Sequence, residues 1–357
     1  MKLNINCAIG GTGYGITSSN IVQRLAARND LDISLFLIGN GFSPNTMQEQ
    51  ETIETLLRNS VTFDHKASCF KVWHPKDLAL RVGTGNYYVF PFFELDTLTF
   101  LEKHHLNTTD HIFVASQWGK TVLENNGIKK PIHIAPLGVD MNIFMKLDFE
   151  RENDTYIFCH VGKWENRKAQ DFLIEAFSNA FDYGDNVELR LAPYNPFLNK
   201  EELNKWYSVV NNSKLNQKIK IYNRFPTQQH LSEFINEAQC CIFPSRAEGW
   251  NNEILECMAL DKPVIATNYS AHTEYCNKEN CFLIDIDELE IAMDNKWFFG
   301  EGSWAKLGDK QMEQTVEYMR YVYKNNICTN QQGVESAKKY SWDNTANIIY
   351  NVITQNG

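Results

Sequence analysis

Two glutamates, Glu248 and Glu256, flank a polar stretch at the point where a strand pattern gives way to a helix pattern. The residues between them include Gly249, Trp250, Asn251 and Asn252. A carboxylate accepts two hydrogen bonds and suits neighbouring hydroxyl groups, as on ribose or a sugar ring. Both asparagines are good N-cap residues, and the free N–H groups of a helix N-terminus suit a phosphate. The stretch predicts a site for a nucleotide-diphosphate sugar; alternatively, Glu253 and Glu256 are only acids that favour the helix start.

Three cations follow another expected strand, which ends at Gly162. They are Lys163, Arg167 and Lys168 in the stretch HVGKWENRKAQDF. In open α/β sheets, ligands bind beyond the carboxyl ends of the strands, so these cations should face the same crevice as the two glutamates. There they could neutralise a diphosphate, chiefly as it leaves. The alternative is an ordinary solvated basic loop.

A glycine-rich loop, GGTGYG at residues 10–15, lies between the first expected strand and helix. Counted from Gly11 and Gly13, the dinucleotide fingerprint needs its third glycine at position 16, where Ile16 stands. No acid follows the second strand to hold an adenosine ribose, so nicotinamide binding is poorly supported. The loop is better suited to letting a ligand or a facing domain approach the backbone.

Other polar residues give weaker signals. Asp285 and Asp287 form a D-x-D pattern at a strand end, but the histidines lack ligand spacing, so no metal site is expected. Glu94, in the aromatic run YYVFPFFELDTLTF, falls near a strand end and could face a cleft. The histidines considered are His104, His105, His111, His133 and His160, of which His111 and His133 are interpreted as structural.

Strand patterns alternate with helix patterns along the chain, which is typical of parallel sheets with right-handed crossovers. The expected strands cover 2–10, 32–39, 87–92, 111–116, 155–162, 187–192, 218–223, 240–245, 263–268 and 281–285. The expected helices include 16–28, 117–126, 168–181, 227–238 and 253–260. The pattern restarts after residue 150, which predicts an α/β protein of two doubly wound, Rossmann-like parallel-sheet domains facing a cleft.

The predicted domains are residues 1–150, an N-terminal Rossmann-like domain that should bind the acceptor, and residues 151–340, a second Rossmann-like domain that should bind the nucleotide-sugar donor. The joint is expected within residues 136–155, where turn residues precede a charge cluster. A last helix, 341–357, should be capped by Ser341 or Asp343 and should carry an apolar face of Ala346, Ile349 and Val352. It could pack on either domain.

Composition limits the function further. Hydrophobic residues make up 43% and charged residues 22% of the 357, which is globular usage. The net charge of −10 works against sequence-independent binding to nucleic acid or anionic membrane. No apolar run reaches the roughly 18–20 residues of a membrane span, and no signal-peptide pattern opens the chain. Nine cysteines without a C-x-x-C pair argue against a disulfide framework, so a cytoplasmic protein is expected.

Taken together, these motifs make the chain resemble the family-4 retaining glycosyltransferases of the GT-B fold, over nearly its whole length. EGWNNEILE at 248–256 is similar to the family's E-x7-E pattern, E-G-[FW]-G-x-P-x-L-E, and CMALDKPVIA follows it. GKWENRK at 162–168 is similar to G-[RK]-x4-K, and PLGVDMNIF at 136–144 to the interdomain G-V-D-x3-F. VASQWGKTVLENNGI at 114–128 and YSWDNTA at 340–346 resemble two further family segments, and the last of these crosses back onto the N-terminal domain in GT-B enzymes.

The resemblance implies roles for these residues. Lys163 and Lys168 would hold the donor diphosphate beside Gly162, Glu256 would bind the ribose, and Glu248 would orient the donor sugar. The remaining implied contacts are Gly249, Trp250, Asn251 and Asn252 on the donor loop, Gly11 and Gly13 near the phosphates or acceptor, and Glu94 on the acceptor side.

Two departures from the family pattern bear on the donor. Glu253 places an extra carboxylate near the diphosphate, and Lys163 stands where Arg is frequent, which removes bidentate geometry. The expected reaction is metal-independent, retaining transfer of a hexose from a UDP- or GDP-linked donor, with no further cofactor, to an acceptor hydroxyl. The acceptor could be a glycan, a lipid-linked sugar, a protein or a modified nucleic-acid base. The alternatives are a sugar-nucleotide epimerase or hydrolase of the same fold, a nicotinamide dehydrogenase and a non-catalytic sugar-nucleotide sensor.

Overall fold

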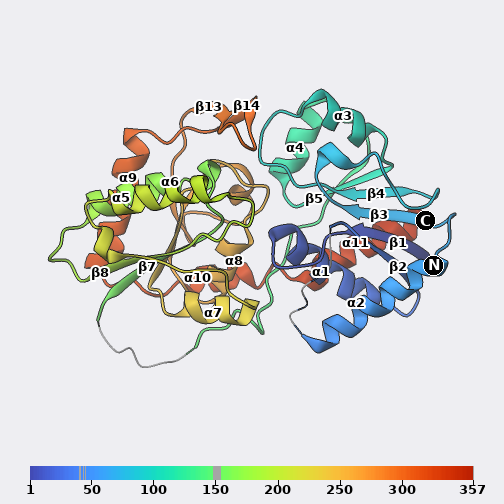
Figure 1. Ribbon diagram of the computed structural model, residues 1–357, viewed down its shortest axis with the longest axis horizontal. Coiled ribbons are helices and arrows are strands. Elements are labelled where there is room, and N and C mark those ends of the chain that lie inside the picture. Colours follow the sequence, from blue (N-terminus) through green and yellow to red (C-terminus); the bar gives the residue numbers. More distant parts are fainter. Residues whose placement is uncertain (40–41, 43, 45, 148–153, 357) are drawn as a thin grey trace. The chain divides into compact units, whose positions relative to one another are not determined.

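The chain divides into two compact units, each built around its own sheet (Figure 1). The computed structural model describes residues 1–39, 42, 44, 46–147 and 154–356. Unit 1 comprises Met1–Gly138 and Tyr340–Gly357, and unit 2 comprises Val139–Lys339. The expected boundary between residues 150 and 151 lies outside the described residues, and the chain passes from unit 1 to unit 2 after Gly138.

Unit 1 contains a parallel sheet that has six strands within its described residues, in the order β2-β1-β3-β4-β5-β6. The strands are β1 (Lys2–Cys7), β2 (Asp32–Leu37), β3 (Ser68–Val72), β4 (Tyr87–Phe90), β5 (His111–Val114) and β6 (Ile132–Ile134). The helices are α1 (Gly13–Ala26), α2 (Met47–Asn59), α3 (Phe100–Asn107), α4 (Gln117–Asn125) and α11 (Trp342–Asn356). The carboxyl ends of all these strands meet at one edge of the sheet.

The glycine-rich loop brings the first strand and helix of unit 1 very close together. A Cβ atom on Gly15 would lie 2.4 Å from the carbonyl oxygen of Gly10, so no larger residue fits without moving backbone. Helix α1 begins at Gly13, because the Thr12 hydroxyl accepts a hydrogen bond from the Gly15 amide. The expected start at Ile16 was therefore three residues late.

The last helix, α11, belongs to unit 1. Ser341 caps it by accepting a hydrogen bond from the Asn344 amide, whereas Asp343 pairs with Arg24 on α1. The expected apolar face is buried at Ala346 and Ile349, but Ile353 takes the place of the expected Val352. A helix that follows the whole of unit 2 in sequence thus completes the core of unit 1.

Unit 2 repeats the architecture with a second parallel sheet, ordered β12-β11-β10-β7-β8-β9 in the described part of the unit. Its strands are β7 (Tyr156–Val161), β8 (Val187–Ala192), β9 (Ile219–Ile221), β10 (Cys240–Phe243), β11 (Val264–Thr267) and β12 (Phe282–Ile284). Its helices are α5 (Gln170–Ala180), α6 (Lys200–Asn211), α7 (Gln228–Asn236), α8 (Asn252–Ala259), α9 (Asp309–Lys324) and α10 (Gln331–Ala337). A small antiparallel hairpin, β13 (Leu289–Met293) and β14 (Phe299–Ala305), extends this unit. Two parallel sheets with flanking helices confirm the expected fold class.

The cores follow the expected pattern. All residues of β7 and β10 are buried, because parallel strands covered on both faces carry continuous apolar runs. All nine cysteines are free thiols, and eight of them are buried. Across the described ranges, no helix is both long and apolar enough to cross a lipid bilayer.

Candidate functional site

Three neighbouring strands of unit 2 send their loops to one edge of the sheet. Strand β10 lies between β11 and β7, and all three run in the same direction. The loop after β7 contains the expected cations, the loop after β10 contains Glu248, and the segment after β11 contains His272. Two of these loops are joined directly, because the Arg246 amide donates to the carbonyl oxygen of Arg167 over 2.7 Å. The topology therefore gathers Lys163, Glu248 and His272, although Lys163 and His272 are 109 positions apart in the sequence.

The gathered charges form a buried network of ion pairs. Arg167 Nη1 lies 2.7 Å from Glu248 Oε2, and Lys168 Nζ lies 2.8 Å from Glu248 Oε1. Arg167 also pairs with Glu165 at 2.8 Å, and Lys163 reaches the same carboxylate at 2.9 Å. The side chains of Arg167, Lys168, Glu165 and Glu248 are 6–7% exposed, whereas that of Lys163 is 37% exposed. Lys163 is thus the one member of the network that faces solvent.

The network keeps its charged forms despite burial. Burial works to raise the pKa of Glu248, but Arg167 and Lys168 outweigh it and hold that pKa far below its usual range. Burial works to lower the pKa of Lys168, and Glu248 followed by Glu253 reverse that effect. Three cations and two carboxylates leave the network with a net charge of +1 at neutral pH. This count leaves out the Glu253 carboxylate, which also acts on Lys168, so an anionic ligand would be attracted by the three cations and not by a net positive charge of the whole site.

Helix α8 begins immediately after this network, and its first turn is built by backbone anchors. Asn251 stands at the N-cap position with φ +80°, and its side chain makes no capping bond. The Asn251 amide instead donates to Nε2 of the buried His272. The Tyr275 hydroxyl bonds the carbonyl oxygens of Trp250 and Asn251 at 2.6 and 3.0 Å. The expected capping role of Asn251 is wrong, because its left-handed backbone turns the side chain toward His272.

Glu256 lies one turn into α8 and is 6% exposed. Burial raises the pKa of this carboxyl group well above its usual range, and the charge of Glu253 adds to the effect. The folded protein therefore favours the protonated form of Glu256. Its Oε2 atom has no hydrogen-bond partner in the part of the chain that the structure describes.

Several other buried polar atoms around this edge also lack partners among the described residues. They are Nε2 of His160, Oγ of Ser245 and Oδ1 of Asn251 and of Asn252. A buried polar group without a partner costs about 1–3 kcal/mol, so such groups are rare. A cluster of them beside a charged network is the arrangement expected of a binding site whose ligand supplies the missing partners.

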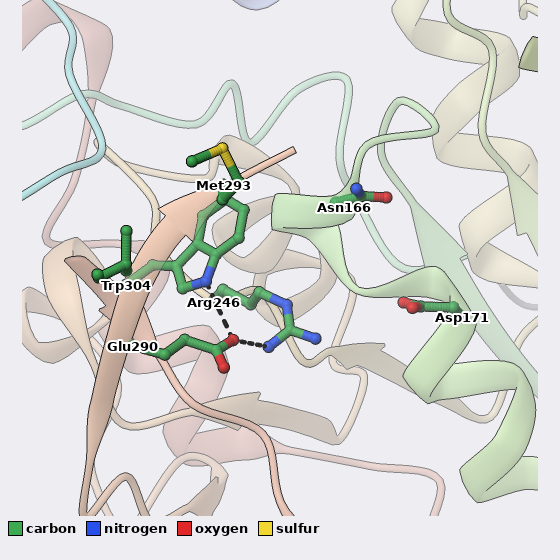
Figure 2. A pocket seen from close by; sticks show the side chains of 7 residues that line it. Asn166, Asp171, Arg246, Glu290, Met293 and Trp304 are labelled. Atoms are coloured by element: carbon green, nitrogen blue, oxygen red, sulfur yellow. Dashed lines mark hydrogen bonds and ion pairs between the residues drawn. The ribbon is translucent and has the colours of Figure 1, made fainter. Parts of the chain in front are cut away.

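A shallow cavity of about 260 Å³ adjoins the network on the side of the hairpin (Figure 2). Figure 2 shows Arg246 and Trp304 both directed at the Glu290 carboxylate, with distances of 2.6 and 3.1 Å. The Ala305 amide also donates to the carbonyl oxygen of Arg246. Through Arg246 the hairpin is therefore attached to the loop that carries Glu248.

The remaining predicted site residues lie in unit 1. Gly11 is exposed in the loop after β1, Gly13 is exposed at the start of α1, and Glu94 is half-buried in the coil after β4. Burial, followed by the Glu94 charge, raises the pKa of Tyr14 in the first turn of α1. The structure thus gathers the residues that were predicted to bind the donor within unit 2, apart from the predicted residues Gly11, Gly13 and Glu94, which lie in unit 1.

The D-x-D pattern has ordinary partners. Asp287 pairs with Lys310 at 2.5 Å, and Asp285 accepts a hydrogen bond from Gln314. Over the described ranges, no group of three His, Cys, Asp or Glu residues is arranged to hold a metal ion.

Sequence reasoning missed Glu165, His272 and Tyr275. Glu165 lies within the stretch of cations, and nothing in that stretch marks it as their partner. His272 follows a predicted strand, so the rule that ligands bind at strand ends could have found it. Tyr275 acts only through backbone carbonyls, and the sequence gives no signal for that.

Comparison with known proteins finds relatives of unit 2. Residues 155–295, from β7 to the hairpin, match the family model of the glycosyl transferases group 1. An uncharacterized glycosyltransferase of Methanocaldococcus jannaschii is 27% identical over 177 residues, which is 46% of this chain and 41% of that protein. The chain therefore matches less than half the length of this relative.

Solved structures share the fold over the whole chain. Sucrose-phosphate synthase from Thermosynechococcus elongatus superposes with a TM-score of 0.73, at 13% identity over 99% of this chain and 98% of that one. Anabaena HepE in complex with UDP and glucose gives 0.70, at 12% identity over 99% and 100%. A glycosyltransferase from Rickettsia africae gives 0.68, at 13% identity over 99% and 98%. These likenesses show the two-domain GT-B fold, and the segment that matches the group 1 family model lies within unit 2.

Proposed function

We propose that this protein is a retaining glycosyltransferase that moves a hexose from a nucleotide-diphosphate sugar to an acceptor hydroxyl group. The observation that carries the proposal is the buried network of Lys163, Lys168, Arg167, Glu165 and Glu248 at the strand ends of unit 2. It lies within the segment that matches the group 1 glycosyltransferases. Anabaena HepE, which has the same fold, was solved with UDP-glucose.

The donor diphosphate is expected to bind between Lys163, Lys168 and the N-terminus of α8. The three cations of the network and the free N–H groups of the helix both favour a diphosphate. The same groups stabilise the charge that develops on the leaving phosphate, which is the work that a metal ion performs in other transferases. The residues of unit 2 thus supply the electrostatic part of catalysis.

The other donor contacts follow along the same loop. Glu248 is charged and can accept hydrogen bonds from sugar hydroxyl groups once Lys168 turns to the phosphate. Glu256 is buried near the end of this loop and can bind the ribose hydroxyl groups. With retention, the departing phosphate takes the proton of the acceptor hydroxyl on the face where the new bond forms.

Unit 1 is proposed to bind the acceptor. Gly11 and Gly13 leave the backbone exposed between β1 and the first turn of α1, and the Glu94 carboxylate follows β4 in the same unit. A carboxylate there can accept a hydrogen bond from the attacking hydroxyl group. The acceptor class that fits is a glycan or another hydroxyl-bearing molecule.

A screen of UDP- and GDP-sugars for thermal stabilisation tests the donor, and turnover with a panel of acceptors tests the reaction. We expect one nucleotide sugar to raise the melting temperature, and the product to keep the donor's anomeric configuration. An inverted product would refute retention. Nucleotide release at full rate without an acceptor would indicate an epimerase or hydrolase. Donor binding without turnover would indicate a non-catalytic sensor. No stabilisation by any nucleotide sugar would refute the proposal.

A further inference from the structure

The Oδ1 atom of Asn251 is a buried hydrogen-bond acceptor whose orientation is set by its neighbours. Asn251 is 6% exposed, and this atom has no partner within the described ranges. The residue occupies a left-handed backbone conformation, φ +80°, at the start of α8. Such a backbone conformation favours Gly or Asn over other residues, so Asn251 places a polar side chain where Gly would be the less strained residue.

His272 determines which way the Asn251 amide faces. Nδ1 of His272 lies 3.0 Å from the carbonyl oxygen of Thr267, so Nδ1 must carry the proton that bonds it. Burial, opposed by Glu248 and by this hydrogen bond, lowers the pKa of His272 to about 4, and the ring is neutral at pH 7. Nε2 therefore has only a lone pair, and the Asn251 group 3.0 Å away must be the NH2 group. The oxygen Oδ1 is left pointing away from His272.

The backbone of Asn251 cannot easily turn to relieve this unpaired acceptor. The Tyr275 hydroxyl bonds the carbonyl oxygens of the two peptide units that flank Asn251, and the Glu248 amide donates to Ser270 Oγ over 2.8 Å. A ligand that brings an N–H or O–H group to Oδ1 would recover the free energy that burial costs this atom. Phosphate oxygens cannot do so at neutral pH, because they are acceptors.

We propose that Asn251 Oδ1 accepts a hydrogen bond from a hydroxyl group of the transferred sugar, and that His272 is the positioning residue that holds it there. The inference rests on the proposed function and adds to it a residue that selects the sugar. Along the chain, Asn251 lies between Glu248, the residue proposed to orient the donor sugar, and Asn252, the first residue of α8. The pair thus distinguishes sugars by one hydroxyl group and leaves recognition of the nucleotide to other residues.

The test measures the affinity of UDP, UDP-glucose and its monodeoxy derivatives for wild type and Asn251→Gly; if the first screen selects GDP-mannose, its derivatives are used. Glycine accepts φ +80° without strain, so the variant keeps the loop. Wild type should bind one deoxy sugar about five- to tenfold more weakly than the parent, the effect of one neutral hydrogen bond. Asn251→Gly should bind the parent and that deoxy sugar equally. Its affinity for the free nucleoside diphosphate should match wild type.

Two variants of His272 test the positioning role. His272→Gln keeps an acceptor near the place of Nε2, so it should keep the discrimination between the parent and deoxy sugars. His272→Asn keeps only the contact to Thr267, so it should lose that discrimination. A merely structural role would lower thermal stability in both without changing sugar preference. Asn326→Gly is the matched control, because Asn326 is exposed and also left-handed, with φ +47°.

Two results would overturn this inference while leaving the proposed function intact. One is an Asn251→Gly variant that discriminates every deoxy sugar as wild type does. The other is an Asn251→Gly variant that loses affinity equally for the free nucleoside diphosphate and for the nucleotide sugar, since this would mean that Asn251 contacts the nucleotide and not the sugar. If wild type binds no nucleotide sugar at all, the proposed function itself fails.

Discussion

Lys168 offers the sharpest test of the charged network. Its ammonium group lies 2.8 Å from Glu248 Oε1, and only 7% of the side chain is exposed. The Lys168→Met variant removes the charge but keeps an unbranched apolar side chain that can pack against Gly162. The Lys168 side chain lies close to that glycine, because a Cβ atom built on Gly162 would be 3.3 Å from Lys168 Cδ. A hydrogen bond to a charged group contributes about 1.5–3 kcal/mol, so nucleoside diphosphate affinity should fall roughly 10- to 100-fold.

The same variant should be only moderately destabilised. Removing one partner of a buried ion pair typically costs about 3–5 kcal/mol, because it leaves a buried charge unpaired. Glu248 would keep Arg167 at 2.7 Å, so the free energy of unfolding should fall by less, about 1–3 kcal/mol. Stability and binding can therefore be measured on a protein that is still folded.

Calorimetric titration with UDP and GDP, together with urea unfolding, gives both numbers. Lys310→Met is the matched control, because Lys310 pairs with Asp287 at the surface and should affect neither quantity. A folded Lys168→Met protein with wild-type affinity for every nucleotide would show that Lys168 does not contact the diphosphate. The assignment of the donor site to this network would then be wrong.

Three further predictions concern stability. Glu256→Gln should melt at a higher temperature than wild type at pH 7 in thermal scans, because the folded protein raises the pKa of Glu256 and favours its protonated form. The contribution of the protonated carboxyl group to the stability of the folded protein is fully present below about pH 4 and is lost as the pH rises. The melting temperatures of the two proteins should therefore converge near pH 4. The melting temperature of wild type should fall between about pH 6.5 and 4, since His160 and His272 have pKa values lowered to about 4 and the unfolded chain takes up their protons first; a flat profile would contradict their burial as neutral rings. Gly15→Ala should destabilise unit 1 by about 1–3 kcal/mol or more in urea unfolding, since its Cβ would meet Gly10, whereas Gly13→Ala has no neighbour within 4 Å and should be neutral.

The sequence alone predicted the strand, loop and helix units around the proposed donor site in unit 2. The apolar run of β10 and the helix pattern of α8 are local signals, and they place Glu248 in a loop at a strand end. Two strands of unit 1 were missed for local reasons as well. Strand β3 is interrupted by Lys71, and β6 has only three residues, so neither has the length of a typical pattern.

The pairing of side chains could not be predicted in the same way. Arg167 and Glu248 are 81 positions apart, and they meet because β7 and β10 are neighbours in the sheet. The sequence suggested cations that face a ligand, whereas the structure pairs each lysine of the network with a carboxylate. Strand order decides these contacts, and a single sequence does not specify it.

This pairing gives Arg167 a role that differs from that of the two lysines. If Lys163 and Lys168 turn to a diphosphate, Glu165 and Glu248 lose one partner each. A buried carboxylate left without a partner would make that exchange costly. Arg167 contacts both carboxylates, at 2.8 and 2.7 Å, and the Ala247 carbonyl oxygen holds its guanidinium at 2.7 Å. Glu165 and Glu248 therefore stay paired with Arg167 while the two lysines turn to the diphosphate. Donor binding would then leave neither buried carboxylate without an ion-pair partner.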